Sequence, residues 1–297
     1  MANVIQKYRS ANLGWLYYKQ YYESTEQVED KNETILKRKF AAITESAFRV
    51  SECKTKKLTI AYPGLLIGSG YILKTVSDNN DAFKVGFFFD HVTGMPCIPG
   101  HSVKGLLRSA FPHHKIEKYP AEKTEMISRY FERDKNKRTT ILKPLFEKYM
   151  LSCKISEAAY TEKRFIELLG NIIFEGQRPR SFEKSKDEFL FEQIPIYERD
   201  IFHDAYVAQG GKENCFLGTD YITPHAGNPL KNPIPIKFLK ILPEVKINFQ
   251  FDVKHELIEP EMKLDLFERI LKDFGIGAKT NVGYGQFVEV KVGTRTV

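Results

Sequence analysis

The chain has 297 residues, of which 42% are hydrophobic and 28% charged, a composition that excludes a disordered protein. A chain of this size buries about three quarters of its unfolded surface, as one large domain or two modest ones. Its formal charge of +7 favours an anionic partner. The sequence has no secretory leader pattern and no apolar run near the roughly 18 residues that span a bilayer. We therefore expect a soluble protein of the cytoplasm.

The first part of the chain is predicted to pass from helices to a sheet. Residues 12–22 and 32–44 carry apolar side chains at helical spacings. From Leu58 the chain becomes β-branched, aromatic and rich in glycine, which is typical of a strand with a bulge. Short apolar runs then indicate a β-hairpin whose turn uses Thr93 and Gly94. The core sheet is thus expected to begin near Leu58.

Residues 98–111, IPGHSVKGLLRSAF, predict a short amphipathic helix that follows a Pro-Gly turn and ends before the next proline. Ser102 is the expected N-cap. Lys104 and Arg108 are four residues apart and share the face opposite the core. Free amides at the helix N-terminus, a hydroxyl and two cations would suit a phosphate backbone, whereas an ordinary solvated helix is the alternative. The candidate RNA-binding residues here are Gly100, His101, Ser102, Lys104 and Arg108.

The remainder of the chain predicts an insertion and the rest of a sheet. Residues 113–192 are heavily charged and helical in pattern. Strand patterns return at 195–209, 215–223, 235–242 and 245–253. The clearest helix covers 259–275, with Pro260 in its first turn and Gly275 as its C-terminal cap, and a last strand follows. The core order of strand, helix, strand, strand, helix, strand predicts an α+β, ferredoxin-like (RRM-like) fold with an antiparallel sheet.

Residues 275–285, GIGAKTNVGYG, form a glycine-rich loop around a cation. Ala278 before Lys279 rules out a Walker A loop, and Thr280 occupies the third glycine position of the dinucleotide pattern. Two interpretations have equal weight. The glycines either let backbone amides and Lys279 approach phosphates or serve only the turns of the connection. On the first interpretation the RNA-binding residues are Gly277, Lys279, Thr280 and Asn281.

No metal or cofactor site is predicted. The four cysteines are far apart and lack a Cys-x-x-Cys pair, so reduced thiols are expected rather than a zinc site or disulfides. The seven histidines lack the spacing of a zinc hydrolase, and no Gly-x-Ser-x-Gly motif is present. The acidic run at 77–81, SDNND, either holds a hydrated Mg²⁺ or is a polar loop, and we favour the loop.

Residues 93–111 and 275–285, taken together, resemble the two signature motifs of the repeat-associated mysterious protein (RAMP) superfamily of CRISPR systems. With the segments LLIGSG and IIFEG, the resemblance covers the chain from about Leu58 to Val290. The N-terminal NLGWLYYK, the insertion and residues 220–239 are most similar to the sixth-subunit family of Cmr (type III-B) effector complexes. His101 departs from this pattern, because the family usually has a small serine there.

The resemblance implies a single RAMP domain over 1–297. It consists of an N-terminal helical extension (1–56), a ferredoxin-like core (57–112 and 193–297) and a mainly helical insertion (113–192). The implied function is that of a non-catalytic subunit of an antiviral ribonucleoprotein, which binds CRISPR RNA (crRNA) toward its 3′ end and caps the backbone filament. The implied partners are the guide RNA, the target RNA, the backbone RAMP subunits and the adjacent capping RAMP subunit, with no membrane.

The resemblance also bears on catalysis. Cleaving backbone relatives have an Asp ahead of the Thr-Gly hairpin, where this chain has Lys84, with Asp81 as the nearest acid. We therefore predict no catalytic residue and no target cleavage. One alternative is a metal-independent endoribonuclease that processes CRISPR RNA, with His101 or His225 as general acid and base. Another is an architectural subunit that meets RNA only through its neighbours.

Overall fold

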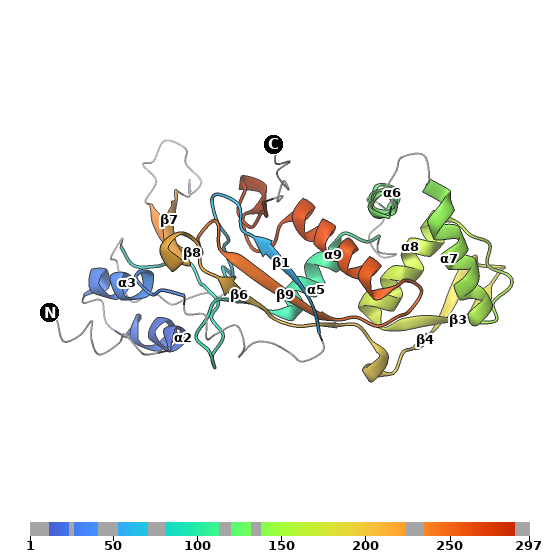
Figure 1. Ribbon diagram of the computed structural model, residues 1–297, viewed down its shortest axis with the longest axis horizontal. Coiled ribbons are helices and arrows are strands. Elements are labelled where there is room, and N and C mark those ends of the chain that lie inside the picture. Colours follow the sequence, from blue (N-terminus) through green and yellow to red (C-terminus); the bar gives the residue numbers. More distant parts are fainter. Residues whose placement is uncertain are drawn as a thin grey trace, which may run out of the picture.

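The computed structural model of the protein describes residues 12–23, 27–40, 53–70, 81–112, 120–131, 138–223 and 235–288. His225 and residues 77–80 of the acidic run lie outside these ranges. The molecule is elongated, with helices α2 and α3 at one end, a sheet in the middle and helices α6, α7 and α8 at the other end (Figure 1). Its helices and antiparallel sheets confirm the α+β class. Within the described ranges, no helix has the length and apolar character needed to cross a membrane.

The central sheet is antiparallel and is organised around its longest strand. The strands are β1 (Lys54–Thr59), β9 (Lys246–Asp252), β6 (Ala205–Gln209) and β2 (Cys97–Ile98), in the order β1-β9-β6-β2. Ile247 of β9 is paired with Leu58 on one side and with Val207 on the other. The short β5 (Ile201–Phe202) pairs with the far end of β9. Strands β1, β5 and β6 therefore all pair with β9.

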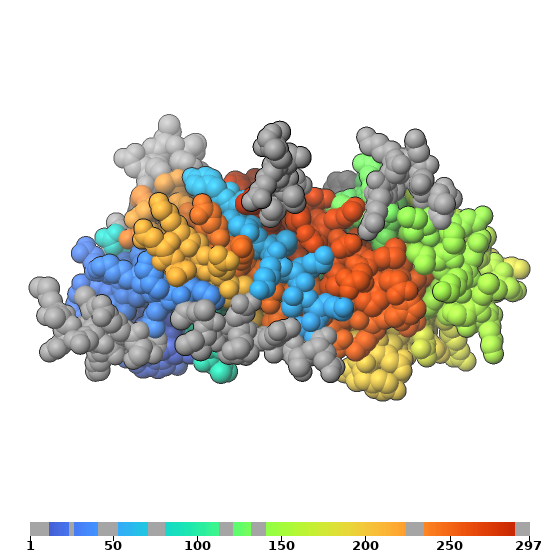
Figure 2. Space-filling view, viewed as in Figure 1, coloured from blue at the N-terminus to red at the C-terminus, as the bar shows by residue number. Residues whose placement is uncertain are grey.

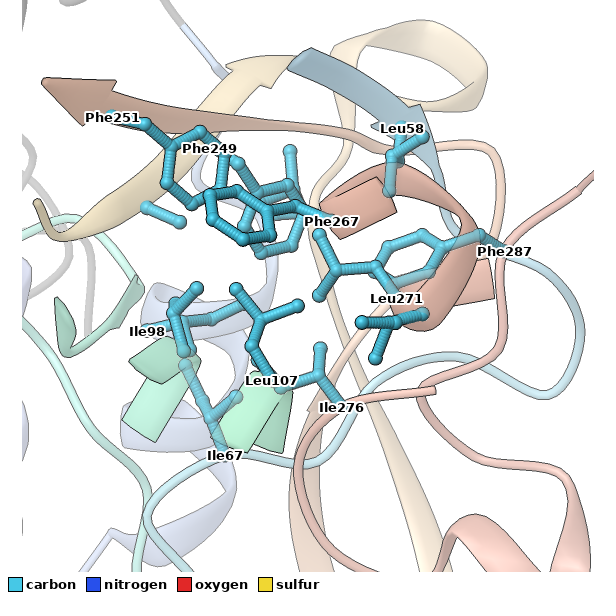
Figure 3. Packing of buried hydrophobic residues seen from close by; sticks show 14 of the residues in the cluster. Leu58, Ile67, Ile98, Leu107, Phe249, Phe251, Phe267, Leu271, Ile276 and Phe287 are labelled. Atoms are coloured by element: carbon cyan, nitrogen blue, oxygen red, sulfur yellow. The ribbon is translucent and has the colours of Figure 1, made fainter. Parts of the chain in front are cut away.

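One face of this sheet is covered by helices α5 (Gly100–Ser109) and α9 (Pro260–Phe274). Ile247, Phe249 and Phe251 alternate along β9 and are buried, as the strict alternation in the sequence predicted. Figure 3 shows Phe249 and Phe251 packed near Phe267 of α9, with α5 on the same side. Each large side chain that is buried at this interface contributes about 1.5–3 kcal/mol to the stability of the fold.

Among these elements, β1 and β2 come before α5 in the chain, β5, β6 and β9 follow it, and α9 comes last. Beyond α9, Phe287 forms an antiparallel bridge with Ile60, and the Val288 amide donates to Thr59. In the described residues the predicted last strand is therefore a single bridge beside β1. This bridge brings the glycine-rich loop back to the start of the sheet.

The N-terminal element packs through tyrosines. Helix α2 (Leu13–Trp15) continues as the π-helix η1 (Leu16–Gln20), as the sequence predicted for this region. The hydroxyls of Tyr17, Tyr18 and Tyr22 donate to backbone carbonyls in the segment at 83–87. These hydrogen bonds satisfy peptide groups that have no ladder partner in that irregular segment.

The second predicted helix, at 32–44, has the wrong bounds. Helix α3 (Val28–Leu36) begins earlier and ends earlier, because the chain turns at Lys37. Lys39 then forms a β-bridge with Cys215. The predicted turn at Thr93-Gly94 is confirmed: the Gly94 amide donates to the Asp90 carbonyl, and Gly94 has a φ of 69°.

The insertion contains helices α6 (Pro120–Tyr130), α7 (Arg138–Ser152) and α8 (Glu162–Gly170), followed by the π-helix η2 (Asn171–Glu175). The prediction of helix up to residue 192 is wrong at its end. Gly176 is left-handed and stops the helix, and β3 (Gln177–Glu183) then pairs with β4 (Glu188–Gln193). Aromatic contact between Phe182 and Phe189 holds this hairpin together.

Two further features complete the fold. Strands β7 (Leu217–Ile222) and β8 (Ile236–Ile241) form a second hairpin, in which Ile241 also bridges to Leu65. Lys263 of α9 is fully buried and donates to Asp200 at 2.7 Å. Burial lowers the pKa of Lys263 and raises that of Asp200, and their mutual attraction opposes both changes.

Candidate nucleic-acid interface

Helix α5 starts one residue after a proline, with Pro99 as its N-cap. A side-chain carbon on Gly100 would lie 2.1 Å from the carbonyl oxygen of Phe202, so only glycine fits this close approach. The Gly100 amide donates to the Asp204 carboxylate at 2.6 Å. One of the backbone N–H donors at this helix N-terminus is therefore already hydrogen-bonded to a carboxylate of the protein itself.

The N-cap prediction for Ser102 is wrong. Ser102 is the third residue of the helix, and its amide donates to the Pro99 carbonyl at 2.8 Å. Its side chain is exposed, as is that of His101, while Lys104 is half-buried. Val103 and Leu107 are buried, so the predicted apolar face is confirmed. The polar face of α5 thus presents a hydroxyl, an imidazole and an ammonium group.

Arg108, predicted on the face of α5 opposite the core, is largely covered by other parts of the chain. Its Nε donates to Glu175 at 2.9 Å, and its Nη1 donates to the Pro112 carbonyl at 3.2 Å. The guanidinium carbon lies 5.9 Å from the centre of the Phe174 ring. The side chain is only 19% exposed. Arg108 therefore joins α5 to the π-helix η2 of the insertion.

The glycine-rich loop uses its backbone to pack against the segment after β1. Three backbone hydrogen bonds hold it there. The amides of Ile276, Ala278 and Gly285 donate to the carbonyls of Gly285, Leu66 and Gly64, respectively. A side-chain carbon would lie 2.4 Å from the Leu66 oxygen if placed on Gly277, and 1.8 Å from the Ile276 oxygen if placed on Gly285. Both glycines also have positive φ angles. These glycines serve close backbone packing.

The outer surface of this loop is polar and cationic. Lys279 adopts a left-handed conformation with φ of 61° and begins the short helix η5 (Thr280–Val282). Lys279 and Asn281 are exposed, and Thr280 is half-buried. Val282 is 67% exposed despite its apolar side chain. The loop therefore turns a cation, an amide and an apolar group toward solvent.

Tyr284 anchors the loop to the second hairpin. Its hydroxyl donates to Asp220 at 2.7 Å, and Lys240 donates to the same carboxylate oxygen at 2.7 Å. Burial alone would raise the pKa of Asp220, but these two hydrogen bonds, a third from the Tyr221 amide and the positive charge of Lys240 together hold that pKa below its usual value. The Lys240 ammonium also lies 5.8 Å from the centre of the Tyr284 ring. Tyr284 and Lys240 thus hold the loop against the β7–β8 hairpin.

The two motifs meet in one core although they lie far apart in the sequence. Leu107 of α5 and Ile276 of the loop are buried in the same hydrophobic cluster, together with Ile67. Figure 3 shows these three side chains close to one another beneath the sheet. The outer parts of α5 and of the loop are therefore fixed relative to each other by a shared apolar contact.

The described residues contain no group of three or more acidic, histidine or cysteine side chains that could hold a metal ion. The Lys84 amide donates to the Lys237 carbonyl. Asp81, the nearby acid, lies 3.5 Å from the Lys237 ammonium. His225, the second candidate for acid–base chemistry, lies outside the described residues.

Two features of this region were missed from the sequence. Asp204 caps α5 from a distant strand connection, and nothing local to either segment signals that contact. Tyr62 is 84% exposed at a turn that is bonded to the glycine-rich loop. The Tyr-Pro-Gly sequence at 62–64 is a turn signal that could have placed this ring on the surface.

The chain is similar to known proteins, among them two curated relatives and one solved structure. The chain is 28% identical over 214 residues to the CRISPR system Cmr subunit Cmr6 of Pyrococcus furiosus, covering 66% of this chain and 58% of the relative. It is 29% identical over 117 residues to the CRISPR system Cms endoribonuclease Csm3 of Streptococcus thermophilus, covering 37% and 53%. The chain thus spans somewhat more than half the length of these relatives. A chain in the cryo-EM structure of the type III-B Cmr-beta complex bound to cognate target RNA is similar with a TM-score of 0.46 and 17% identity, covering 96% and 85%.

A family model described as the RAMP superfamily matches residues 57–288. This range contains the central sheet except for the first residues of β1, together with α5, α9, the insertion and the glycine-rich loop. The match covers well over half of the chain and includes both sequence motifs. The protein belongs to the RAMP superfamily.

Proposed function

We propose that the chain is an RNA-binding subunit of a cytoplasmic type III CRISPR effector complex, of the Cmr (type III-B) kind. It binds the guide RNA toward its 3′ end and caps the backbone filament for antiviral defence, without cleaving RNA. The names of its two curated relatives, both CRISPR-system proteins, support this assignment. The formal charge of +7 suits a polyanionic ligand.

The observation that carries the proposal is a pair of lysines for which the described residues provide no ion-pair partner, one on each of the two motifs that share a hydrophobic core. Lys104 on α5 and Lys279 on the loop have no ion-pair partner among the described residues. Other cations nearby are already paired, such as Arg108 with Glu175 and Lys240 with Asp220. An unpaired cation on a rigid scaffold is available for a phosphate.

The proposed site divides its residues by role. Lys104 and Lys279 contact phosphates, and the exposed side chains of His101, Ser102 and Asn281 donate hydrogen bonds to ribose or phosphate oxygens, with Thr280 beside them. Gly100 and Gly277 shape the backbone, because neither tolerates a side chain. Arg108 holds α5 in place through Glu175.

The test is a salt titration of RNA binding by the full chain. A fluorescein-labelled single-stranded RNA is titrated with the wild type and with the Lys104→Ala/Lys279→Ala variant at several salt concentrations. Each lost phosphate contact reduces the slope of log K against log salt by about 0.7. We expect weaker binding and a slope smaller by about 1.4 for the double variant.

A matched control is Lys186→Ala, because Lys186 is an exposed lysine in the β3–β4 turn of the insertion. This variant should keep the wild-type slope. Equal slopes for the double variant and the wild type would contradict the proposed site.

The proposal also concerns partners and organisation. The guide RNA, the target RNA, the backbone RAMP subunits and the adjacent capping subunit are the proposed partners. We propose one RAMP domain, with residues 1–56 and 113–192 available for contacts with those subunits. Purification of the complex from its native host should yield a multi-subunit particle that carries short RNAs, and a lone protein without RNA would contradict this.

A second candidate function is supported by the name of one relative, which is an endoribonuclease. On this alternative the chain processes CRISPR RNA without a metal ion, with exposed His101 as an acid or base. Incubation of the full chain with repeat-sequence RNA in EDTA separates the two functions. We expect no product, whereas cleavage that His101→Ala abolishes would favour the endoribonuclease.

A further inference from the structure

Tyr62 is an aromatic side chain that the fold leaves in solvent. Its relative exposure is 84%, whereas the tyrosines of η1 and Tyr284 are largely buried against other side chains. The ring follows β1 at the turn formed by residues 61–64, where the Gly64 amide donates to the Ala61 carbonyl at 3.0 Å. A large ring held in water has no packing role at that position.

The backbone around Tyr62 is fixed on both sides by the glycine-rich loop. The Ala61 amide donates to the Gln286 carbonyl, and the Gly64 carbonyl accepts from the Gly285 amide, both at 2.8 Å. A side-chain carbon on Gly64 would lie 2.4 Å from the Ile241 oxygen, so the turn also sits tightly on β8. Tyr62 is therefore an exposed ring on a rigid base, which loses little backbone entropy when a ligand binds.

The loop that is hydrogen-bonded to this turn also carries the exposed Lys279 of the proposed RNA site. Lys279 lies on the loop that holds the turn, since its carbonyl accepts from the Tyr284 amide beside Gly285. Val282, 67% exposed, adds an apolar group on that loop. In Figure 1 the turn after β1 lies beside the segment after α9, and in Figure 2 the light-blue chain after β1 reaches the surface near the orange β7–β8 hairpin.

We propose that Tyr62 stacks on a base of single-stranded RNA whose adjacent phosphate is contacted by Lys279. Successive bases expose their faces in a single strand, and stacking on aromatic rings tolerates any sequence. The combination of a rigid ring, an apolar neighbour and a cation suits such a strand better than a folded protein surface or a duplex. This inference rests on the proposed RNA-binding function and assigns one of its contacts.

The other exposed tyrosines in the described part of the chain lack this combination. Tyr197 is 73% exposed in the short helix η3 (Ile196–Glu198), next to Glu198, which lies 3.7 Å from Arg178. Tyr221 lies under the Lys237 ammonium, 5.7 Å from the ring centre. Tyr197 is therefore a suitable control, because it is a similarly exposed ring away from the glycine-rich loop.

The test compares ring removal with charge removal on one labelled single-stranded RNA. Tyr62→Ala should weaken binding about 5- to 150-fold, the effect expected for one stacked base. The slope of log K against log salt should stay at the wild-type value, because no phosphate contact is lost. Tyr62→Phe should bind like the wild type, since the ring remains, and Tyr197→Ala should have no effect. Unchanged thermal unfolding of Tyr62→Ala would show that the fold is intact.

A second probe isolates the base. An RNA of the same length that carries abasic ribose-phosphate units should bind the wild type and Tyr62→Ala with equal affinity. If Tyr62→Ala binds the normal RNA within twofold of the wild type while Lys279→Ala weakens it, the stacking inference is overturned and the proposed function survives. If the wild type binds no RNA, both are overturned. Loss of copurifying protein subunits with unchanged RNA affinity would make Tyr62 a protein contact and also overturn the inference.

Discussion

Helix α5 and the loop after α9 both carry glycines and cations, but these residues have different roles in the two segments. At α5 the Gly100 amide is bound by Asp204, and Arg108 is bound by Glu175, so much of its polar chemistry already has partners. In the loop, the backbone packs inward while Lys279 and Asn281 face solvent. Each motif therefore contains two kinds of residue. Some are bonded within the protein and hold the segment in place, and others face solvent and are available to a ligand.

The largest expected effect concerns the glycines. Gly285→Ala places a side-chain carbon 1.8 Å from the Ile276 oxygen at a φ of 70°. Left-handed strain of about 1–2 kcal/mol and overpacking of about 1–3 kcal/mol should lower the free energy of unfolding by about 3 kcal/mol or more. Urea denaturation of the purified variant measures this change.

Gly105→Ala in α5 is the matched control. A side-chain carbon there has nothing within 4 Å, and the residue lies inside a helix. Alanine should raise the free energy of unfolding by about 0.5–1 kcal/mol. Similar destabilisation by the two changes would contradict the assignment of the loop glycines to close backbone packing.

The next effect concerns the carboxylate at the start of α5. Asp204→Ala removes the acceptor of the Gly100 amide and should lower the free energy of unfolding by about 1–2 kcal/mol. Asp204→Asn keeps an oxygen acceptor and should lose less. An unchanged urea midpoint for Asp204→Ala would show that the amide finds another acceptor, and α5 would then be more available to an anion than we describe.

Arg108 and Lys104 should differ although they lie on the same helix. Arg108→Ala should cost about 1 kcal/mol of stability, because the side chain is mostly buried and joins Glu175 and Phe174. Lys104→Ala should change stability by less than about 0.5 kcal/mol while weakening RNA binding. Thermal unfolding and RNA titration of both variants test this. If Lys104→Ala lowered stability and Arg108→Ala weakened RNA binding alone, the roles assigned to the two residues would be wrong.

The smallest expected effect is a pH dependence at the base of the loop. Burial would raise the pKa of Asp220, but the hydrogen bonds from Lys240, Tyr284 and the Tyr221 amide, together with the charge of Lys240, hold it below its usual value. The stability from this carboxylate is therefore present above its unfolded pKa of about 3.9 and is lost as pH falls through its lower folded pKa. Asp220→Asn should lose less stability than the wild type between pH 6 and pH 3 in urea titrations. A steeper loss in the variant would contradict the hydrogen-bond assignment.

Local patterns predicted the elements that depend on their own residues. Helix α9 was predicted because Pro260, its apolar spacing and Gly275 all lie within the helix or at its ends. Strand β9 was predicted by its alternation. The α+β class followed from the order of such elements.

Contacts across the chain could not be predicted in this way. Glu175 is 67 residues from Arg108, and Asp204 is 104 residues from Gly100, so neither partner is visible in a local window. The β3–β4 hairpin was missed because its charged, aromatic strands lie at the end of a helical pattern, and only the left-handed Gly176 separates them. The candidate site was predicted as a set of residue types, but which cations are free depends on these distant partners.

The most direct test of the central claim is RNA crosslinking in the assembled particle. RNA that contains 4-thiouridine in the guide strand is incorporated into the complex and irradiated, and crosslinked peptides are identified by mass spectrometry. The account predicts crosslinks within residues 100–109 and 275–285 of this chain. Crosslinks confined to the insertion, or none on this chain, would contradict it.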